Sequence, residues 1–181
     1  MKAQKVIILT LLVMLTFTNN GICQKKQKKI KCRLDVDKVD AFSGDTIKDK
    51  YLRYIWRGAV LGFSRVGKNY IIHLNVSKVG DKKESVNQGD ELFLKLNNGE
   101  MLTLKCGKEA KPDSRIEADQ YSAEVYTYYR IEFPVSQEDL LNLINSPPIA
   151  LKMNIAGEEK SLTFKEDDQK DVSDAVYCIL H

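Results

Sequence analysis

The sequence predicts an α+β fold made mainly of antiparallel β-sheet, arranged as hairpins in a meander. A short helix near residues 136–145 and a C-terminal helix complete it. Three observations lead to this fold class. Apolar and polar residues alternate over much of the chain from Lys31, which is the period of β-strands. Turn residues interrupt the alternation often, so successive strands are expected to pair antiparallel. Helical spacing of apolar residues is clear only in the last quarter of the chain.

The first 23 residues have the pattern of a signal peptide. A lysine-containing start precedes the apolar run Val6–Phe17, and small residues precede a cut site before Gln24. The run is shorter than the roughly 20 residues of a membrane-spanning helix, so we expect it to be removed. Lipidation of Cys23 is less favoured, because Ile22 is not the small residue that lipoprotein processing prefers. We therefore expect export, to the periplasm or the extracellular space, with no transmembrane span in the mature chain.

Charge and length suggest a basic arm followed by one domain. Residues 24–30 are rich in lysine, whereas all 25 acidic residues lie from Leu34 onward. We expect the arm to be a solvated tail, although it could also touch anionic lipid or polyanionic glycan. Residues 31–181 suit a single globular α+β domain. Because this domain shows no basic face, we predict no nucleic-acid partner.

Three cysteines would remain in the mature chain, namely Cys32, Cys106 and Cys178. One bridge between any two of them is compatible with an oxidising compartment. Free thiols are equally compatible, because unpaired cysteine is among the most buried residue types. The alternation places Cys32 and Cys106 toward the core, and the pairing stays open.

The first half of the domain is expected to form strands separated by turns. Cys32–Ala41 alternates and then breaks at Phe42–Asp45. Ile47–Phe63 fits either a helix or strands, and its aromatic and β-branched residues favour strands. A turn at Val66–Asn69 leads into a clear strand. One face of that strand is apolar and consists of Tyr70, Ile72, Leu74 and Val76.

The strongest hairpin signal follows in the middle of the chain. A turn at Gln88–Asp90 precedes one strand, and Asn98–Gly99 reverses the chain, since both residues tolerate the positive φ of tight turns. The returning strand is Met101–Cys106. The polar segment Lys108–Gln120 contains Pro112 and is expected to be a loop. The core face of the hairpin is expected to carry Leu92, Leu94, Leu96, Leu102 and Leu104.

The last third of the chain is expected to mix strands and helices. Tyr121–Val135 reads as a long strand, in which Pro134 marks an edge or the strand end. Ser136 can cap a short helix that acidic residues favour at its start. A second hairpin is centred on Ala156–Glu158, and the final helix starts at about Asp168. The apolar side of the short helix is expected to be Leu140, Leu141 and Ile144.

Three segments resemble small exported proteins of unknown function from Bacteroidota. They are the turn Asp40–Gly44, the hairpin Gly89–Glu100 and the segment Phe133–Leu140. The resemblance covers most of the mature chain, and its motifs are turns, a hairpin and a helix cap. It implies export and a mostly β domain, and it brings no activity or catalytic residue.

The composition offers little for catalysis or for metal binding. The two histidines are His73 and His181, and alternation places His73 on an exposed sheet face. Nucleophilic catalysis needs a base beside the nucleophile, so we predict no catalytic residue and no cofactor. The acidic residues of segment 35–45 lack the spacing of a calcium loop, and those near Asp168 suit a helix start. We therefore predict no metal site.

A binding surface is the best functional candidate. Alternation places Tyr126, Tyr128 and Arg130 opposite the core-facing residues of their strand. Exposed aromatic rings beside charges can stack on a sugar or anchor a protein, unless a second layer covers them. The sequence thus favours an exported, non-enzymatic binding or accessory module for a glycan or another envelope protein. The alternative is a hydrolase of envelope polymers or polysaccharides that uses paired carboxylates such as Glu124 and Glu132.

Overall fold

The structure is a computed structural model, and it describes residues 30–52, 58–118 and 122–181. The chain divides into two units, Met1–Lys31 and Cys32–His181, and every element below belongs to the second unit. The expected signal peptide and residues 24–29 of the expected basic arm lie outside the described residues. Within the described ranges, no helix is long and apolar enough to cross a membrane.

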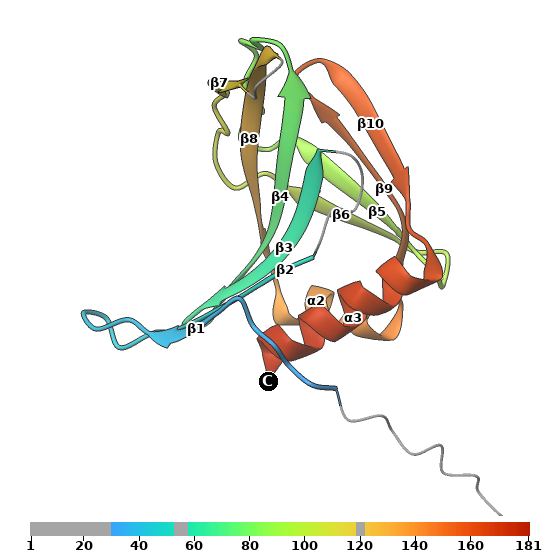
Figure 1. The fold of residues 1–181 in the computed structure, drawn as a ribbon. Coiled ribbons are helices and arrows are strands. Elements are labelled where there is room, and N and C mark those ends of the chain that lie inside the picture. The colour runs from blue at the N-terminus through green and yellow to red at the C-terminus, as the bar shows by residue number, and fades with distance from the viewer. Residues whose placement is uncertain (1–29, 53–57, 119–121) are drawn as a thin grey trace, which may run out of the picture. The chain divides into compact units, whose positions relative to one another are not determined.

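The described elements confirm the predicted α+β class, with mostly antiparallel strands and two helices, one of them C-terminal. Figure 1 labels them along the chain. In order they are β1 (Val36–Val39), β2 (Thr46–Tyr51), β3 (Ala59–Val66), β4 (Asn69–Val79), β5 (Glu91–Leu96), β6 (Met101–Lys105), β7 (Asp113–Ala118), β8 (Ala123–Val135), α2 (Gln137–Asn145), β9 (Pro148–Ile155), β10 (Glu158–Thr163) and α3 (Glu166–Leu180).

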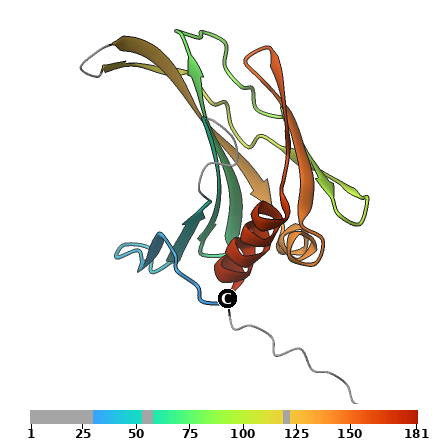
Figure 2. The same cartoon turned by 45° about the vertical axis from the view of Figure 1, so that its right-hand side comes forward.

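The strands form two sheets that face each other. Among the described residues, one sheet has six strands in the order β1-β2-β3-β4-β8-β7, and the other has four in the order β10-β9-β5-β6. Figures 1 and 2 show α2 and α3 together at one end of the two sheets. There α3 contacts β2 and β3 of the larger sheet and β9 of the smaller one. The helices therefore close one end of the space between the sheets.

The core lies between the two sheets, where the predicted apolar faces meet. Burial removes apolar surface from water, which is the main favourable term in folding. Ile72 and Leu74 of β4 are fully buried, as are Ile131 and Phe133 of β8. In the β5–β6 hairpin, Leu102 is half-buried and the other four predicted leucines are buried, which confirms the predicted core face. These are Leu92, Leu94, Leu96 and Leu104.

The two predicted hairpin turns are present, and they differ in which turn residues have a positive φ. Between β5 and β6, Gly99 has a φ of 90° and its amide donates to the Leu96 carbonyl at 3.0 Å. Asn98 does not need positive φ there, and its side-chain oxygen instead accepts from the Glu100 amide at 3.0 Å. Between β9 and β10, Ala156 and Gly157 both have positive φ, 49° and 73°. This pair matches the twist of a two-residue hairpin.

The sequence of residues 47–63 fits either a helix or strands, and the structure shows strands in the described part of this segment. β2 and β3 occupy both ends of this segment, and residues 53–57 lie outside the described residues. The two strands are antiparallel, with Tyr51 opposite Gly62. A Cβ on residue 62 would overlap the Tyr51 ring, so glycine lets this ring lie across β3.

The prediction of a loop over Lys108–Gln120 is wrong for Asp113–Ala118, because these residues form β7. All six residues of β7 are exposed, so no apolar alternation marks the strand. Backbone pairing with β8 holds it instead. The strand predicted over Tyr121–Val135 is otherwise confirmed from Ala123 onward, and Pro134 lies one residue before its end.

The short helix begins as predicted, with one correction to its apolar side. Ser136 accepts from the Asp139 amide at 3.0 Å, and the Asp139 carboxylate accepts from the Ser136 amide at 3.1 Å, which is a capping box. Leu141 is 43% exposed, whereas Leu143 is 1% exposed. Leu143 faces the core because it lies three residues after Leu140, on the same side of the helix.

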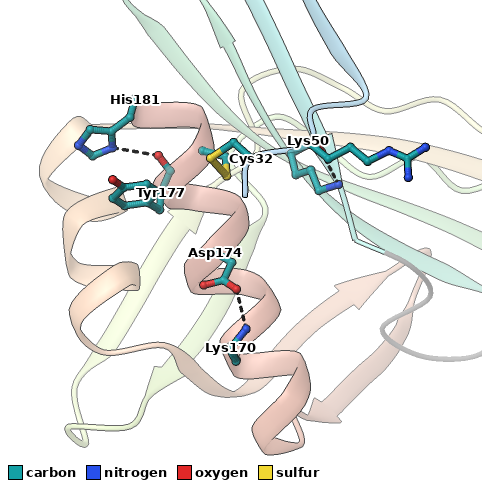
Figure 3. Close-up of a disulfide and its surroundings, with 8 residues drawn as sticks. Cys32, Lys50, Lys170, Asp174, Tyr177 and His181 are labelled. Carbon is teal, nitrogen blue, oxygen red and sulfur yellow. Dashed lines mark hydrogen bonds and ion pairs between the residues drawn. A yellow bond between two sulfur atoms is a disulfide. The ribbon is translucent and has the colours of Figure 1, made fainter. Parts of the chain in front are cut away.

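One disulfide joins Cys32 to Cys178, across a sequence separation of 146 residues (Figure 3). It ties the segment before β1 to the last turns of α3. The expectation that Cys32 points into the core is wrong. Its strand starts only at Val36, and Cys32 itself is exposed. Cys106 is the free cysteine of the described residues and is buried, as predicted, and this burial raises the pKa of its thiol.

Candidate functional site on the outer face of the larger sheet

The candidate site lies on the outer face of the larger sheet, the face that turns away from β5, β6, β9 and β10. Residues of a strand alternate between faces, so β8 presents its even-numbered residues here while Tyr129 and Ile131 are buried inside. Tyr126 and Tyr128 are half-buried on this face, and Arg130 is exposed. The structure therefore places the three sequence-predicted residues together on the face where they were expected.

Strand register determines which side chains join the tyrosines. Arg115 of β7 lies opposite Tyr126, and Asp113 lies opposite Tyr128. On the other side of β8, Asn75 of β4 lies opposite Arg130. The result is a cavity of about 590 Å³ over β3, β4, β8 and β7. Its walls include Val60, Asn75, Arg115 and Glu117 beside the three predicted residues.

Hydrogen bonds and an ion pair hold the two tyrosine rings in place. The Tyr126 hydroxyl donates to Glu124 Oε2 at 2.9 Å, and the Tyr128 hydroxyl donates to Glu117. The Arg115 guanidinium lies 5.8 Å from the centre of the Tyr128 ring and is itself held by Asp113, with Nε 3.1 Å from the carboxylate. The bond to Glu117 raises the pKa of Tyr128, so its hydroxyl stays protonated at neutral pH.

A second polar group lies further along the same face. His73 Nε2 is 2.7 Å from Ser64 Oγ, and the His73 ring centre is 6.0 Å from that of Tyr51. The prediction of an exposed His73 is therefore wrong, because Tyr51 of β2 and Ser64 of β3 lie beside it and leave it half-buried. Burial lowers the pKa of His73, and the nearby Glu132 partly opposes this, so the ring is neutral at pH 7.

The Ser64–His73 contact is poorly placed for nucleophilic catalysis. Ser64 is only 4% exposed, so its hydroxyl cannot readily approach a substrate on the face. The carboxylates named for a hydrolase are also poorly placed. Glu124 and Glu132 are eight residues apart on β8, and a strand of that length spans about 26 Å. Glycoside hydrolysis needs two carboxyl groups about 5 to 10 Å apart.

Sequence reasoning missed most residues that surround the predicted three. Arg115 and Glu117 lie in a segment expected to be a loop, so no strand face was assigned to them. Asn75 lies two residues after His73 and so on the same face of β4, but its position opposite Arg130 depends on the pairing offset between β4 and β8. That offset is the signal that a single sequence lacks.

Comparison of the chain with protein-family models, with curated proteins and with solved structures found no match. Within the described ranges, no group of three or more histidine, cysteine, aspartate or glutamate side chains could hold a metal ion. The chemistry of the outer face is thus the main guide to function.

Proposed function

We propose that the protein is an exported, non-enzymatic binding module that holds a glycan on the outer face of its larger sheet. Tyr126, Tyr128 and Arg130 are the central binding residues. The observation that carries this proposal is the cavity of about 590 Å³ in which both rings meet fixed polar groups. Its volume lies within the range of roughly 300 to 1,000 Å³ typical of small-ligand sites.

The side chains around this cavity suit a sugar. A pyranose ring offers an apolar C–H face and several hydroxyl groups, so it needs a flat apolar surface beside donors and acceptors. The tyrosine rings and Val60 supply apolar surface, Asn75 and Arg130 supply donors, and Glu117 supplies an acceptor. Because the hydrogen bonds of the tyrosine hydroxyls already orient the rings, little side-chain entropy is lost on binding.

A glycan is better supported than a protein partner at this position. Protein interfaces of standard size bury about 800 Å² on each partner and place their anchors in large, well-packed patches. Here the aromatic groups line a cavity of the size of a small ligand. A hydrolase is the least supported hypothesis, because Glu124 and Glu132, the two carboxylates named for it, lie far apart along β8.

Export is part of the proposal. The expected signal peptide falls outside the described residues, so its support comes from the charged start and apolar run of the sequence. The Cys32–Cys178 bridge also supports it, because disulfides persist mainly in oxidising compartments.

The test is affinity electrophoresis of the mature chain in gels that contain single envelope or dietary polysaccharides, with pull-down on peptidoglycan. We expect at least one of these to retard the wild type. The Tyr126→Ala/Tyr128→Ala variant is then expected to bind at least about thirtyfold more weakly, as for hot-spot aromatic residues. Tyr126→Phe/Tyr128→Phe keeps both rings and is expected to lose less. Tyr177→Ala, on α3, is the control and is expected to bind normally.

Two outcomes would contradict the proposal. One is a double alanine variant that folds, with the unfolding midpoint of the wild type, and still binds. The other is a wild type that none of the polysaccharides retards. If the double variant fails to fold, Arg130→Ala serves instead, since Arg130 is exposed and its removal leaves the core intact. Normal glycan binding by that variant would then overturn the assignment of this face.

A further inference from the structure

Strand β7 is an exposed edge. It is the last strand of the larger sheet, and all six of its residues are exposed. Ile116, in its middle, is 74% exposed. An open edge offers unpaired backbone groups to another strand, and proteins usually protect it with charged side chains, proline or a bulge. The charged side chains of β7 are of both signs, namely Asp113, Arg115 and Glu117, so they repel a second strand only in some registers. Within β7 there is no proline, and its pairing with β8 is regular.

The backbone groups that face outward can be identified from the hydrogen bonds of β8. The Val125 carbonyl accepts from the Gly80 amide at 2.7 Å, on the β4 side. Because successive residues of a strand direct their backbone groups to opposite sides, the even-numbered residues of β8 face β7. Their partners are Asp113, Arg115 and Glu117. The outward backbone groups of β7 are therefore those of Ser114, Ile116 and Ala118.

Charge then selects one way for this edge to pair with itself. An antiparallel copy must match outward residues with outward residues, so Ile116 can face Ser114, Ile116 or Ala118 of the partner. Ile116 opposite Ser114 sets Arg115 against Arg115, and Ile116 opposite Ala118 sets Glu117 against Glu117. Like charges directly opposite each other are unfavourable. In the third register, Ile116 lies opposite Ile116. Arg115 of each copy then lies opposite Glu117 of the other copy, which gives two pairs of opposite charge.

We propose that β7 pairs antiparallel with β7 of a second copy of this chain, centred on Ile116. The occupant of the edge is then another molecule of the same protein, related by a two-fold axis. The two exposed isoleucines contact each other on the inner side of the joined sheet. On the outer side, Arg115 and Glu117 of both chains meet between the two cavities. The dimer therefore carries two outer-face cavities on one continuous sheet.

The test is the oligomeric state of the mature, oxidised chain by sedimentation velocity over a range of concentrations. We expect a concentration-dependent dimer. Arg115→Glu and Glu117→Arg each create two like-charge pairs, so each is expected to raise the dissociation constant at least tenfold. The double variant Arg115→Glu/Glu117→Arg exchanges the charges and is expected to restore the dimer. A wild type that stays monomeric, or single and double variants that behave alike, would overturn the proposal.

Cross-linking gives a second measurement of the same register. With Ile116→Cys, the two new thiols lie opposite each other, at a Cα separation of about 5.5 Å for a hydrogen-bonded antiparallel pair. That separation suits a disulfide. Mild oxidation is expected to yield a covalent dimer at protein concentrations where Ser161→Cys, on the edge strand β10, yields none. Equal cross-linking of the two variants would show that the contact is not specific to β7.

Discussion

The Cys32–Cys178 bridge is expected to supply a large part of the stability of the domain. In the chain-entropy model, closing a loop of 146 residues stabilises the folded state by about 5 kcal/mol at 25 °C. A domain of this kind is stable by only about 5 to 15 kcal/mol in total. Cys32→Ala is the cleanest way to break the bridge, because Cys32 is exposed whereas Cys178 is 5% exposed and packed in the core.

Urea unfolding followed by circular dichroism measures this loss. Cys32→Ala is expected to lower the free energy of unfolding by about 5 kcal/mol and the melting temperature by roughly 10 to 20 °C. The wild type in a reducing agent is the control, and it should agree with the variant, because both lack the same bond. A loss below about 1 kcal/mol in both would refute the reasoning and point to a compact unfolded chain.

Three further predictions concern single side chains. Leu94→Ala is expected to cost about 2 to 5 kcal/mol of unfolding free energy, because Leu94 is 1% exposed, whereas Lys95→Ala on the other face costs far less; equal urea midpoints would contradict the hairpin register. Gly62→Ala is expected to cost about 1 to 3 kcal/mol, because the new methyl group displaces the Tyr51 ring, and Gly62→Ala combined with Tyr51→Ala should recover part of the loss. Hydrogen bonding to Lys160, followed by the charge of Lys78, lowers the pKa of Glu158 to about 2 in the folded state. The stability that this carboxylate supplies is thus present above its unfolded pKa, 4.5, and is lost as the pH falls toward about 2. Glu158→Gln is expected to flatten the decline of melting temperature in this range, and parallel curves for variant and wild type would contradict the assignment.

The sequence predicts the secondary structure best where burial of side chains imposes a regular spacing of apolar residues. The leucines of the β5–β6 hairpin alternate because one face of each strand packs in the core, so period and turn residues suffice to find them. The same reasoning placed Tyr126 and Tyr128 outward on β8. β7 could not be predicted from apolar spacing, because it buries none of its side chains and is held by backbone hydrogen bonds to β8. The polar composition of β7 is also that of a loop.

What lies over or beside a residue was less predictable than the face on which it sits. His73 was assigned to the correct face of β4, but the cover by Tyr51 depends on the pairing of β2 with β3 across Gly62. The pairing of Cys32 with Cys178 also could not be predicted, because it depends on how distant elements pack. Cys32 and Cys178 meet because α3 packs on β2 and β3, close to the start of the domain. Neither contact has a signal in local sequence.

The position of Cys106 between the two bridged cysteines bears on oxidative folding. Bridges from Cys106 to Cys32 or to Cys178 close loops about half as long as the native one. Halving a loop favours its closure by about 0.6 kcal/mol, or nearly threefold, so the unfolded chain forms each wrong bridge more readily. Only folding reverses this order, since it buries the Cys106 thiol, with its hydrogen bond to the Lys108 carbonyl at 2.9 Å, away from any exchange partner. The native bridge is thus favoured only after the core has folded around Cys106. A chain that is oxidised before folding depends on disulfide exchange to form the native bridge.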